Sequence, residues 1–163
     1  MKKVIVIGCP GSGKSTFARR LRDETNLPLY YLDMIWHKPD KTNITPEEFD
    51  SKLEEILCKP MWIIDGNYLR TLKQRIKQWD TIFFLDIPLE SCILGAKSRI
   101  GHKREDLPWI ETAFDDEFKQ YICDFHSQQL PQIYELLKKY GTTKNSILFK
   151  TREAMDVYMR NMV

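Results

Sequence analysis

The sequence lacks the features of a membrane protein or of a disulfide-stabilised secreted protein. None of its apolar runs approaches the roughly 18 residues of a membrane helix, and the run that follows Met1-Lys2-Lys3 stops at Gly8. The four cysteines stand at positions 9, 58, 92 and 123, without a CxxC pair and without a histidine at zinc spacing. Scattered thiols of this kind favour a reducing compartment, so we expect a cytoplasmic protein with no membrane partner.

A strong excess of charge is also missing. Lys and Arg number 25 and Asp and Glu number 23, which gives a formal net charge of only +2. Such a balance argues against direct nucleic-acid binding. Internal repeats, low-complexity tracts and interdomain linkers are absent as well, while a hydrophobic content of 42% suffices for a core. We therefore predict one domain over residues 1–163, as a monomer or a small homo-oligomer.

The sequence does contain an alternation of short apolar runs and amphipathic stretches, which indicates a parallel sheet between helical layers. Continuous apolar runs of this kind are typical of strands buried on both faces, and they predict strands over 4–7, 29–32, 61–64, 81–85 and 146–149. Helical spacing predicts helices over 14–23, 46–57, 68–79, 89–100 and 151–159. A further long helix is expected up to Tyr140, with a break or a restart at Pro131 and an end at Gly141.

The stretch GCPGSGKS, from Gly8 to Ser15, matches the pattern G-x-x-x-x-G-K-[ST] in full, after a strand and before a helix. Glycines let the backbone point successive N–H groups at phosphate oxygens, and the helix N-terminus adds the positive end of a dipole. The motif predicts a phosphate-binding loop (P-loop), with ATP and Mg²⁺ as cofactors. In it, Lys14 is the expected catalytic contact to the β- and γ-phosphates, and Ser15 the metal ligand. The expected cofactor-binding residues are Gly8, Pro10, Gly11, Ser12, Gly13, Lys14, Ser15 and Thr16.

Three predicted strands end in an acidic residue, at the edge of the sheet where ligands of open α/β folds bind. Asp65 ends the run WIID, directly after three apolar residues, as a carboxylate that orients Mg²⁺ should. Asp33 precedes the irregular segment that begins at residue 34, where it could accept a proton from a substrate hydroxyl or anchor a substrate group. Asp86 precedes Pro88 and is expected to be structural.

The stretch DGNYLRTLKQ, from Asp65 to Gln74, resembles the DGFPRT-x-x-Q stretch of adenylate kinases and related nucleoside-monophosphate kinases. Together with the P-loop, it places the chain near the P-loop kinase superfamily, and its pattern is most similar to the topology-modulation (FlaR-type) proteins. The resemblance implies a three-layer α/β/α fold with a small acceptor-binding insert over 34–58 and a lid over 100–117. It also implies that Arg70 holds an acceptor phosphate and that Gln74 reads an acceptor base.

Further site residues follow from this resemblance. Arg99 and Arg104 would cover the transferring phosphoryl group from the lid, because bidentate guanidinium groups suit its spread negative charge. Arg152 follows the last strand and is expected to border the donor adenine. Trp36 stands where adenylate kinases carry a phosphate-binding arginine, and with Trp109 it could line a substrate cleft.

Three functions are consistent with these patterns. The first is an ATP-dependent kinase that phosphorylates a nucleoside monophosphate through Arg70 and Gln74. The second is a kinase for a hydroxylated metabolite that uses Asp33 as a general base. The third is a nucleotide-binding regulator that affects DNA topology without kinase activity, against which the near-neutral charge counts.

Overall fold

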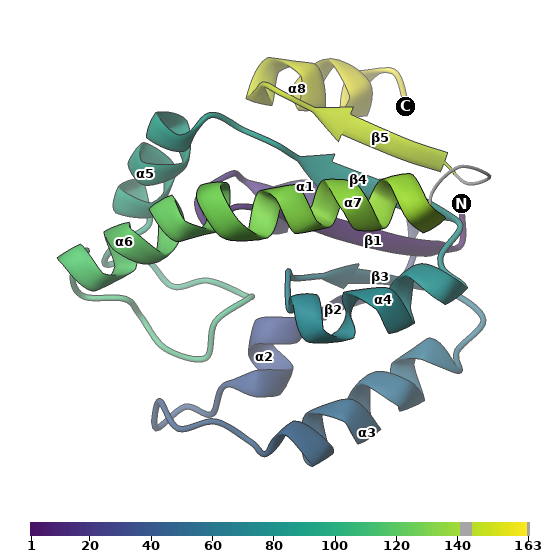
Figure 1. Cartoon of the computed structure of the whole chain (residues 1–163), viewed down its shortest axis with the longest axis horizontal. Coiled ribbons are helices and arrows are strands. Elements are labelled where there is room, and N and C mark those ends of the chain that lie inside the picture. Colours follow the sequence, from purple (N-terminus) through teal and green to yellow (C-terminus); the bar gives the residue numbers. More distant parts are fainter. Residues whose placement is uncertain (141–144, 163) are drawn as a thin grey trace.

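The computed structural model describes residues 1–140 and 145–162. Its centre is a five-stranded, all-parallel sheet with the strand order β2-β3-β1-β4-β5, which confirms the predicted sheet (Figure 1). No end of a strand differs from its predicted position by more than one residue. They are β1 (Lys3–Gly8), β2 (Leu29–Tyr31), β3 (Trp62–Asp65), β4 (Thr81–Leu85) and β5 (Asn145–Phe149).

The helices follow the predicted alternation, with one short addition. They are α1 (Lys14–Thr25), α2 (Leu32–Trp36), α3 (Pro46–Leu57), α4 (Leu69–Gln78), α5 (Leu89–Ser98), α6 (Asp116–Asp124), α7 (Leu130–Tyr140) and α8 (Arg152–Arg160). A capping box begins α3, because the Thr45 hydroxyl accepts from the Glu48 N–H while the Glu48 carboxylate accepts from the Thr45 N–H.

Strand β4 shows how the sheet separates two helical layers. The Phe83 ring packs against Phe17 of α1 and Tyr158 of α8. The next ring, Phe84, packs against Tyr134 of α7. Since successive side chains of a strand point to opposite faces, α1 and α8 cover one face and α7 covers the other. A strand buried in this way needs a continuous apolar sequence, which TIFFL provides.

Near Pro131, where a break or a restart is expected, the helix does not break, and α7 starts at Leu130 after a change of helix type. Residues Phe125–Gln129 form a π-helical turn, η1, and the chain runs from α6 through η1 into α7 as one helical path (Figure 1). The Leu130 N–H donates to the carbonyl of Phe125, five residues earlier. A proline removes an N–H and crowds the preceding turn, and the widened turn just before it accommodates both effects. The end expected at Gly141 lies outside the described residues.

The segment after β2 was expected to be irregular from residue 34, and this is wrong for its first part. Helix α2 includes Asp33 and Trp36, and it is too short to show helical periodicity. The following turn is closed by an antiparallel bridge between His37 and Asn43. The segment that is expected to form a lid, between α5 and α6, has no helix or strand over 101–115. Both segments lie at the end of the sheet toward which the strand arrows point in Figure 1.

The hydrophobic residues of the sheet and of its covering helices form a core. Among residues 1–140 and 145–162, no helix combines the length and the apolar character that a membrane crossing requires.

Candidate active site

The P-loop runs from the end of β1 to the start of α1, as its sequence predicts. Gly11 and Gly13 have φ values of 82° and 98°, in the left-handed region that favours glycine. The loop also lies tightly against α5. A side chain at Gly11 would overlap the Cys92 carbonyl, and a side chain at Gly95 would overlap the Gly11 carbonyl. Gly95 is therefore part of the loop's packing, which the motif alone did not reveal.

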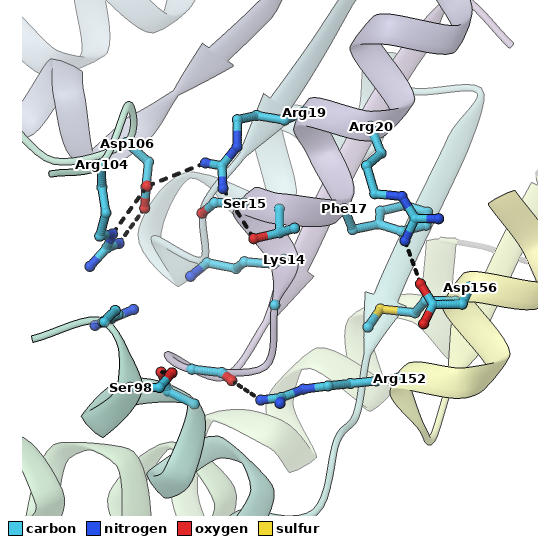
Figure 2. A pocket seen from close by; sticks show the side chains of 16 residues that line it. Lys14, Ser15, Phe17, Arg19, Arg20, Ser98, Arg104, Asp106, Arg152 and Asp156 are labelled. Atoms are coloured by element: carbon cyan, nitrogen blue, oxygen red, sulfur yellow. Dashed lines mark hydrogen bonds and ion pairs between the residues drawn. The ribbon is translucent and has the colours of Figure 1, made fainter. Parts of the chain in front are cut away.

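A cavity of about 370 Å³ opens beside the P-loop. Figure 2 shows side chains from α1, α5, α8 and the segment after α5 pointing toward it. Two carboxylates and six cationic groups line it, so that positive charge prevails, as a polyanionic ligand requires. The cations are Lys14, Arg19, Arg20, Arg99, Arg104 and Arg152, and the carboxylates are Asp106 and Asp156.

Most residues predicted to bind the cofactor border this cavity. Gly11, Gly13, Lys14, Ser15, Thr16 and Arg152 line it. Pro10 instead lines a neighbouring cavity. Gly8 and Ser12 are buried behind the loop surface, where the Asn67 side chain accepts from the Gly8 N–H at 3.1 Å and donates to the Gly8 carbonyl at 2.9 Å.

The two residues predicted to hold magnesium lie close together. Asp65 ends β3 and is 3% exposed. Burial raises the pKa of Asp65 to about 6, although the Lys14 charge and a hydrogen bond from the Ser15 hydroxyl counteract it. One carboxylate oxygen, Oδ1, has no hydrogen-bond partner among the described residues. A buried oxygen of this kind next to a hydroxyl fits the oxygen ligands that Mg²⁺ prefers.

The turn after β3 is held by a buried cation. The Arg75 guanidinium, on α4, is fully buried and donates to the carbonyls of Gly66, Asn67 and Tyr68. Burial lowers the pKa of Arg75 to about 9, and Asp65 counteracts this shift. Arg75 therefore fixes the backbone that presents the Asn67 and Tyr68 side chains to the site. Sequence reasoning missed this residue and selected its neighbours on the same helix.

Those neighbours lie elsewhere. Arg70 forms a two-point contact with Asp50 of α3, at 2.9 and 2.7 Å, and its side chain is 56% exposed. Neither Arg70 nor Gln74 is among the described residues that line the two cavities. The acceptor roles expected for both residues therefore stay predictions that the geometry does not support.

A second cavity, of about 730 Å³, adjoins the first. The predicted residues Asp33 and Trp36 line it, together with Trp109. The Tyr68 hydroxyl donates to Asp33 Oδ1 at 2.8 Å, which orients this carboxylate. Burial raises the pKa of Tyr68, and the Asp33 charge raises it further, so the phenol stays a neutral donor. The other residues that line the second cavity include Pro10, His37, Asn67, Leu69, Leu107, Glu111, Phe118, Tyr121 and Gln129.

Three side chains line both cavities, namely Lys14, Arg99 and Arg104. Two of them carry acidic partners in the segment after α5. The Arg104 Nη1 donates to Glu111 at 2.6 Å, and Arg99 Nε lies 3.0 Å from the same carboxylate. Burial lowers the pKa of Arg99, and the nearby Arg104 charge acts in the same direction. The charges predicted to meet a phosphoryl group are thus gathered where the two cavities meet.

Asp106 is a site residue that sequence reasoning missed. It is 2% exposed, pairs with Arg104 through both oxygens, and lies 3.6 Å from Arg19 (Figure 2). Burial alone would raise the pKa of Asp106, but Arg104, Lys14 and the Ser15 hydroxyl together hold it below its usual range. An acid inside a charged loop carries no periodic signal, so only the fold reveals that this carboxylate sits among the P-loop cations.

Arg152 also differs in part from expectation. It lines the first cavity, yet its guanidinium donates to the carbonyls of Gly11 and Ser91, at 2.8 and 3.1 Å (Figure 2). This contact ties the start of α8 to the P-loop and to α5.

Comparison by sequence finds no matching family model and no matching curated protein. Comparison by structure finds kinases. A shikimate kinase from Acinetobacter baumannii, solved with shikimate, superposes with a TM-score of 0.64 at 13% identity, over 99% of this chain and 90% of the other. The chain has the P-loop kinase fold. An unliganded sugar kinase from Janibacter sp. HTCC2649 gives a TM-score of 0.55 at 18% identity, over 99% of this chain and 91% of the other.

The predicted three-layer fold of a P-loop kinase is thereby confirmed. The finer similarity to the topology-modulation proteins stays a prediction.

Proposed function

We propose that this chain is an ATP-dependent phosphotransferase that moves the γ-phosphoryl group to a small acceptor. The observation that carries the proposal is the meeting of two cavities at Lys14, Arg99 and Arg104. The first cavity adjoins the P-loop and is rich in cations, which suits a triphosphate. Charge in phosphoryl transfer spreads over the equatorial oxygens of the moving group, and the three shared cations are available to oppose it.

The donor side follows from the P-loop and its neighbours. The backbone N–H groups at the start of α1 and the Lys14 ammonium would bind the phosphates. The Ser15 hydroxyl and the Asp65 carboxylate would hold Mg²⁺, which neutralises phosphate charge when it is bound. Arg152 would act by supporting the P-loop backbone through the Gly11 carbonyl rather than by contacting the base.

The second cavity supports a hydroxylated acceptor over a nucleoside monophosphate. Beyond the three shared cations, the residues described around it include the acids Asp33 and Glu111 but no lysine or arginine. A nucleoside monophosphate would need a cation for its own phosphate, and Arg70 is instead paired with Asp50 on the protein surface. The nucleoside-monophosphate kinase implied by the resemblance is therefore the second candidate.

Asp33 is the proposed general base. An alcohol must lose its proton as it attacks the γ-phosphorus, and a carboxylate within hydrogen-bond reach can accept that proton. Asp33 lines the second cavity and is held by the Tyr68 hydroxyl at 2.8 Å. The remaining oxygen of the carboxylate can then face the acceptor. Aromatic side chains of the same cavity, among them Trp36 and Trp109, provide apolar surface for the rest of the acceptor and exclude water.

A coupled assay that detects ADP, run with Mg-ATP over panels of neutral polyols, nucleosides and nucleoside monophosphates, tests the proposal. We expect turnover with a neutral hydroxylated compound. We expect Asp33→Asn to lower kcat by about a hundredfold or more while the affinity for ATP changes little. Asp116→Asn, at an exposed carboxylate, is the matched control and should leave kcat unchanged.

The variant Arg70→Ala separates the two acceptor classes. It should leave the acceptor KM unchanged for a hydroxylated compound and raise it for a nucleoside monophosphate. Turnover of a monophosphate that depends on Arg70 would refute the preferred acceptor, and the absence of transfer to every member of the panels would refute the phosphotransferase itself.

A further inference from the structure

Two thiols and an imidazole from three separate elements lie close together in the structure. Cys9 belongs to the P-loop, Cys92 to α5 and His126 to η1. One potential ligand atom of each residue lies within 4.8 Å of the other two. Cys9 is 1% exposed and Cys92 is fully buried, while His126 is half-buried. The sequence separations hide this group completely, since its members are 83 and 34 residues apart (92 − 9 and 126 − 92).

The surroundings of His126 fix its ring. Its Nδ1 lies 3.3 Å from the Ile122 carbonyl, and its Nε2 lies 3.1 Å from the Ile87 carbonyl. A neutral imidazole has one N–H, so only one of these nitrogens can donate. The other then keeps a lone pair. A histidine that binds a metal through one nitrogen commonly donates its other N–H to a backbone carbonyl. Either carbonyl can accept that N–H here, and a bound cation would have to displace the other carbonyl from the second nitrogen.

The two sulfur atoms lie against the same carbonyls. Cys92 Sγ is 3.4 Å from the Ile87 oxygen, and Cys9 Sγ is 3.9 Å from the Ile122 oxygen. The two sulfur atoms also lie within 4.8 Å of each other. The group is therefore a compact set of soft donors in a shell of backbone oxygens rather than a set of separate apolar side chains.

The donor set selects a class of cation. Thiolate sulfur and imidazole nitrogen are the ligands of Zn²⁺ in proteins, with bonds of about 2.3 Å and about 2.0 Å. A tetrahedral centre with such bonds places its ligand atoms roughly 3.5–3.8 Å apart. Contraction of the group by about 1 Å would therefore suffice. A hard cation such as Mg²⁺ prefers oxygen ligands, so this site is chemically distinct from the one at Ser15 and Asp65.

We propose that Cys9, Cys92 and His126 bind one thiophilic divalent cation, Zn²⁺ being the best match, as a brace between the P-loop, α5 and η1. On binding, each thiol releases its proton to solvent and becomes a thiolate ligand, and the imidazole binds as its neutral form. The site does not take part in phosphoryl transfer and stands independently of the proposed function. It would restrict the motion of the P-loop relative to α5 and η1.

The proposal is tested with Co²⁺, which replaces Zn²⁺ in such sites and reports its ligands by colour. Reduced, metal-free full-length protein is titrated with CoCl₂ and then with ZnCl₂, and the absorption spectrum is followed. We expect one Co²⁺ per chain, a thiolate-to-cobalt charge-transfer band, intense visible bands of tetrahedral geometry, and loss of all bands when Zn²⁺ displaces the cobalt.

Four variants make the test specific. Cys92→Ser and His126→Gln should each weaken Co²⁺ binding by roughly a hundredfold or more. Loss of a residue that only supports a metal ligand lowers metal affinity by up to about a hundredfold, and loss of a ligand itself should lower it at least as much. Cys58→Ser and His102→Gln, at an exposed thiol and an exposed imidazole, should bind like the unchanged protein. Circular dichroism establishes that each variant is folded, and His126→Gln, at the less buried position, keeps the test valid if Cys92→Ser does not fold.

Three results would overturn the proposal. The first is the absence of a thiolate-to-cobalt band in the reduced protein. The second is a band that persists in His126→Gln and Cys92→Ser, or that disappears in Cys58→Ser. A Cys9–Cys92 disulfide formed by a thiol oxidant, in protein whose reduced form binds no Co²⁺, would assign the pair to redox chemistry and would likewise overturn it.

Discussion

Replacing Asp65 by asparagine should make the folded protein more stable at neutral pH, although it removes a proposed magnesium ligand. Asp65 is buried at the end of β3, and its pKa is raised from 3.8 to about 6. A carboxyl whose pKa is higher in the folded state costs stability once it ionises. This cost is absent below about pH 4, where both states are protonated, and it is complete above about pH 6.

The magnitude follows from the shift. Two pKa units correspond to about 3 kcal/mol of unfolding free energy at full ionisation. Between about pH 4.5 and about pH 7.5, the ionisation of Asp65 should account for about 2 kcal/mol of this loss in unfolding free energy. The stability of Asp65→Asn minus that of the unchanged protein should therefore grow by about 2 kcal/mol over this range. Any constant effect of the amide cancels in the change with pH.

The assay is urea unfolding followed by circular dichroism, at several pH values, without nucleotide or divalent cations. Asp116→Asn, at an exposed carboxylate, serves as the control and should show a nearly flat difference. A flat difference for Asp65→Asn would refute the argument from burial. A difference that shrinks as pH rises would show that attraction to Lys14 outweighs burial. Under the proposed function the same variant should lose most of its turnover, so that stability and activity change in opposite directions.

Three further predictions concern groups that the fold brings together. Gly95→Ala should lower the free energy of unfolding, measured in urea, by about 1–3 kcal/mol and should weaken ATP binding, measured by calorimetry, because the alanine methyl group would overlap the Gly11 carbonyl. Unchanged ATP affinity would contradict this. Arg75→Met should lower the free energy of unfolding, measured in urea, by about 3 kcal/mol or more, because three carbonyl groups lose their hydrogen-bond donor. A decrease of less than about 1 kcal/mol would show that water replaces the guanidinium. Asp106→Asn should tighten Mg²⁺-free ATP roughly tenfold in calorimetry, since the carboxylate competes with phosphate for Arg104, and weaker binding would show that Asp106 supports the site instead.

The fold was predictable because its signals are local. Runs such as VIVIG and TIFFL are long enough to identify strands buried on both faces. The P-loop motif is contiguous, so its position between a strand and a helix could be read directly. Helix α2 was missed because five residues are too few to show a period, and the π-helical turn before Pro131 was missed because a proline ordinarily interrupts a helix.

The site was predictable only in its contiguous part. Asp65 and Ser15, both predicted to hold magnesium, could be selected because Asp65 ends a recognisable strand and Ser15 lies at the start of a recognisable helix. Arg75 was missed because the family pattern drew attention to Arg70, five positions earlier on the same helix, and the two residues lie on different sides of it. Asp106 was missed for another reason: its partners come from distant segments, and nothing in a charged loop distinguishes a buried acid from an exposed one.

The common wall of the two cavities has a kinetic consequence. Lys14, Arg99 and Arg104 face both cavities. These three side chains provide no separate site that would hold a phosphoryl group after it leaves the donor and before it reaches the acceptor. A transfer that passes between the two cavities needs donor and acceptor bound together in a ternary complex. Double-reciprocal plots at several fixed acceptor concentrations should therefore intersect rather than run parallel, and no phosphorylated form of the enzyme should accumulate when the donor nucleotide is supplied alone.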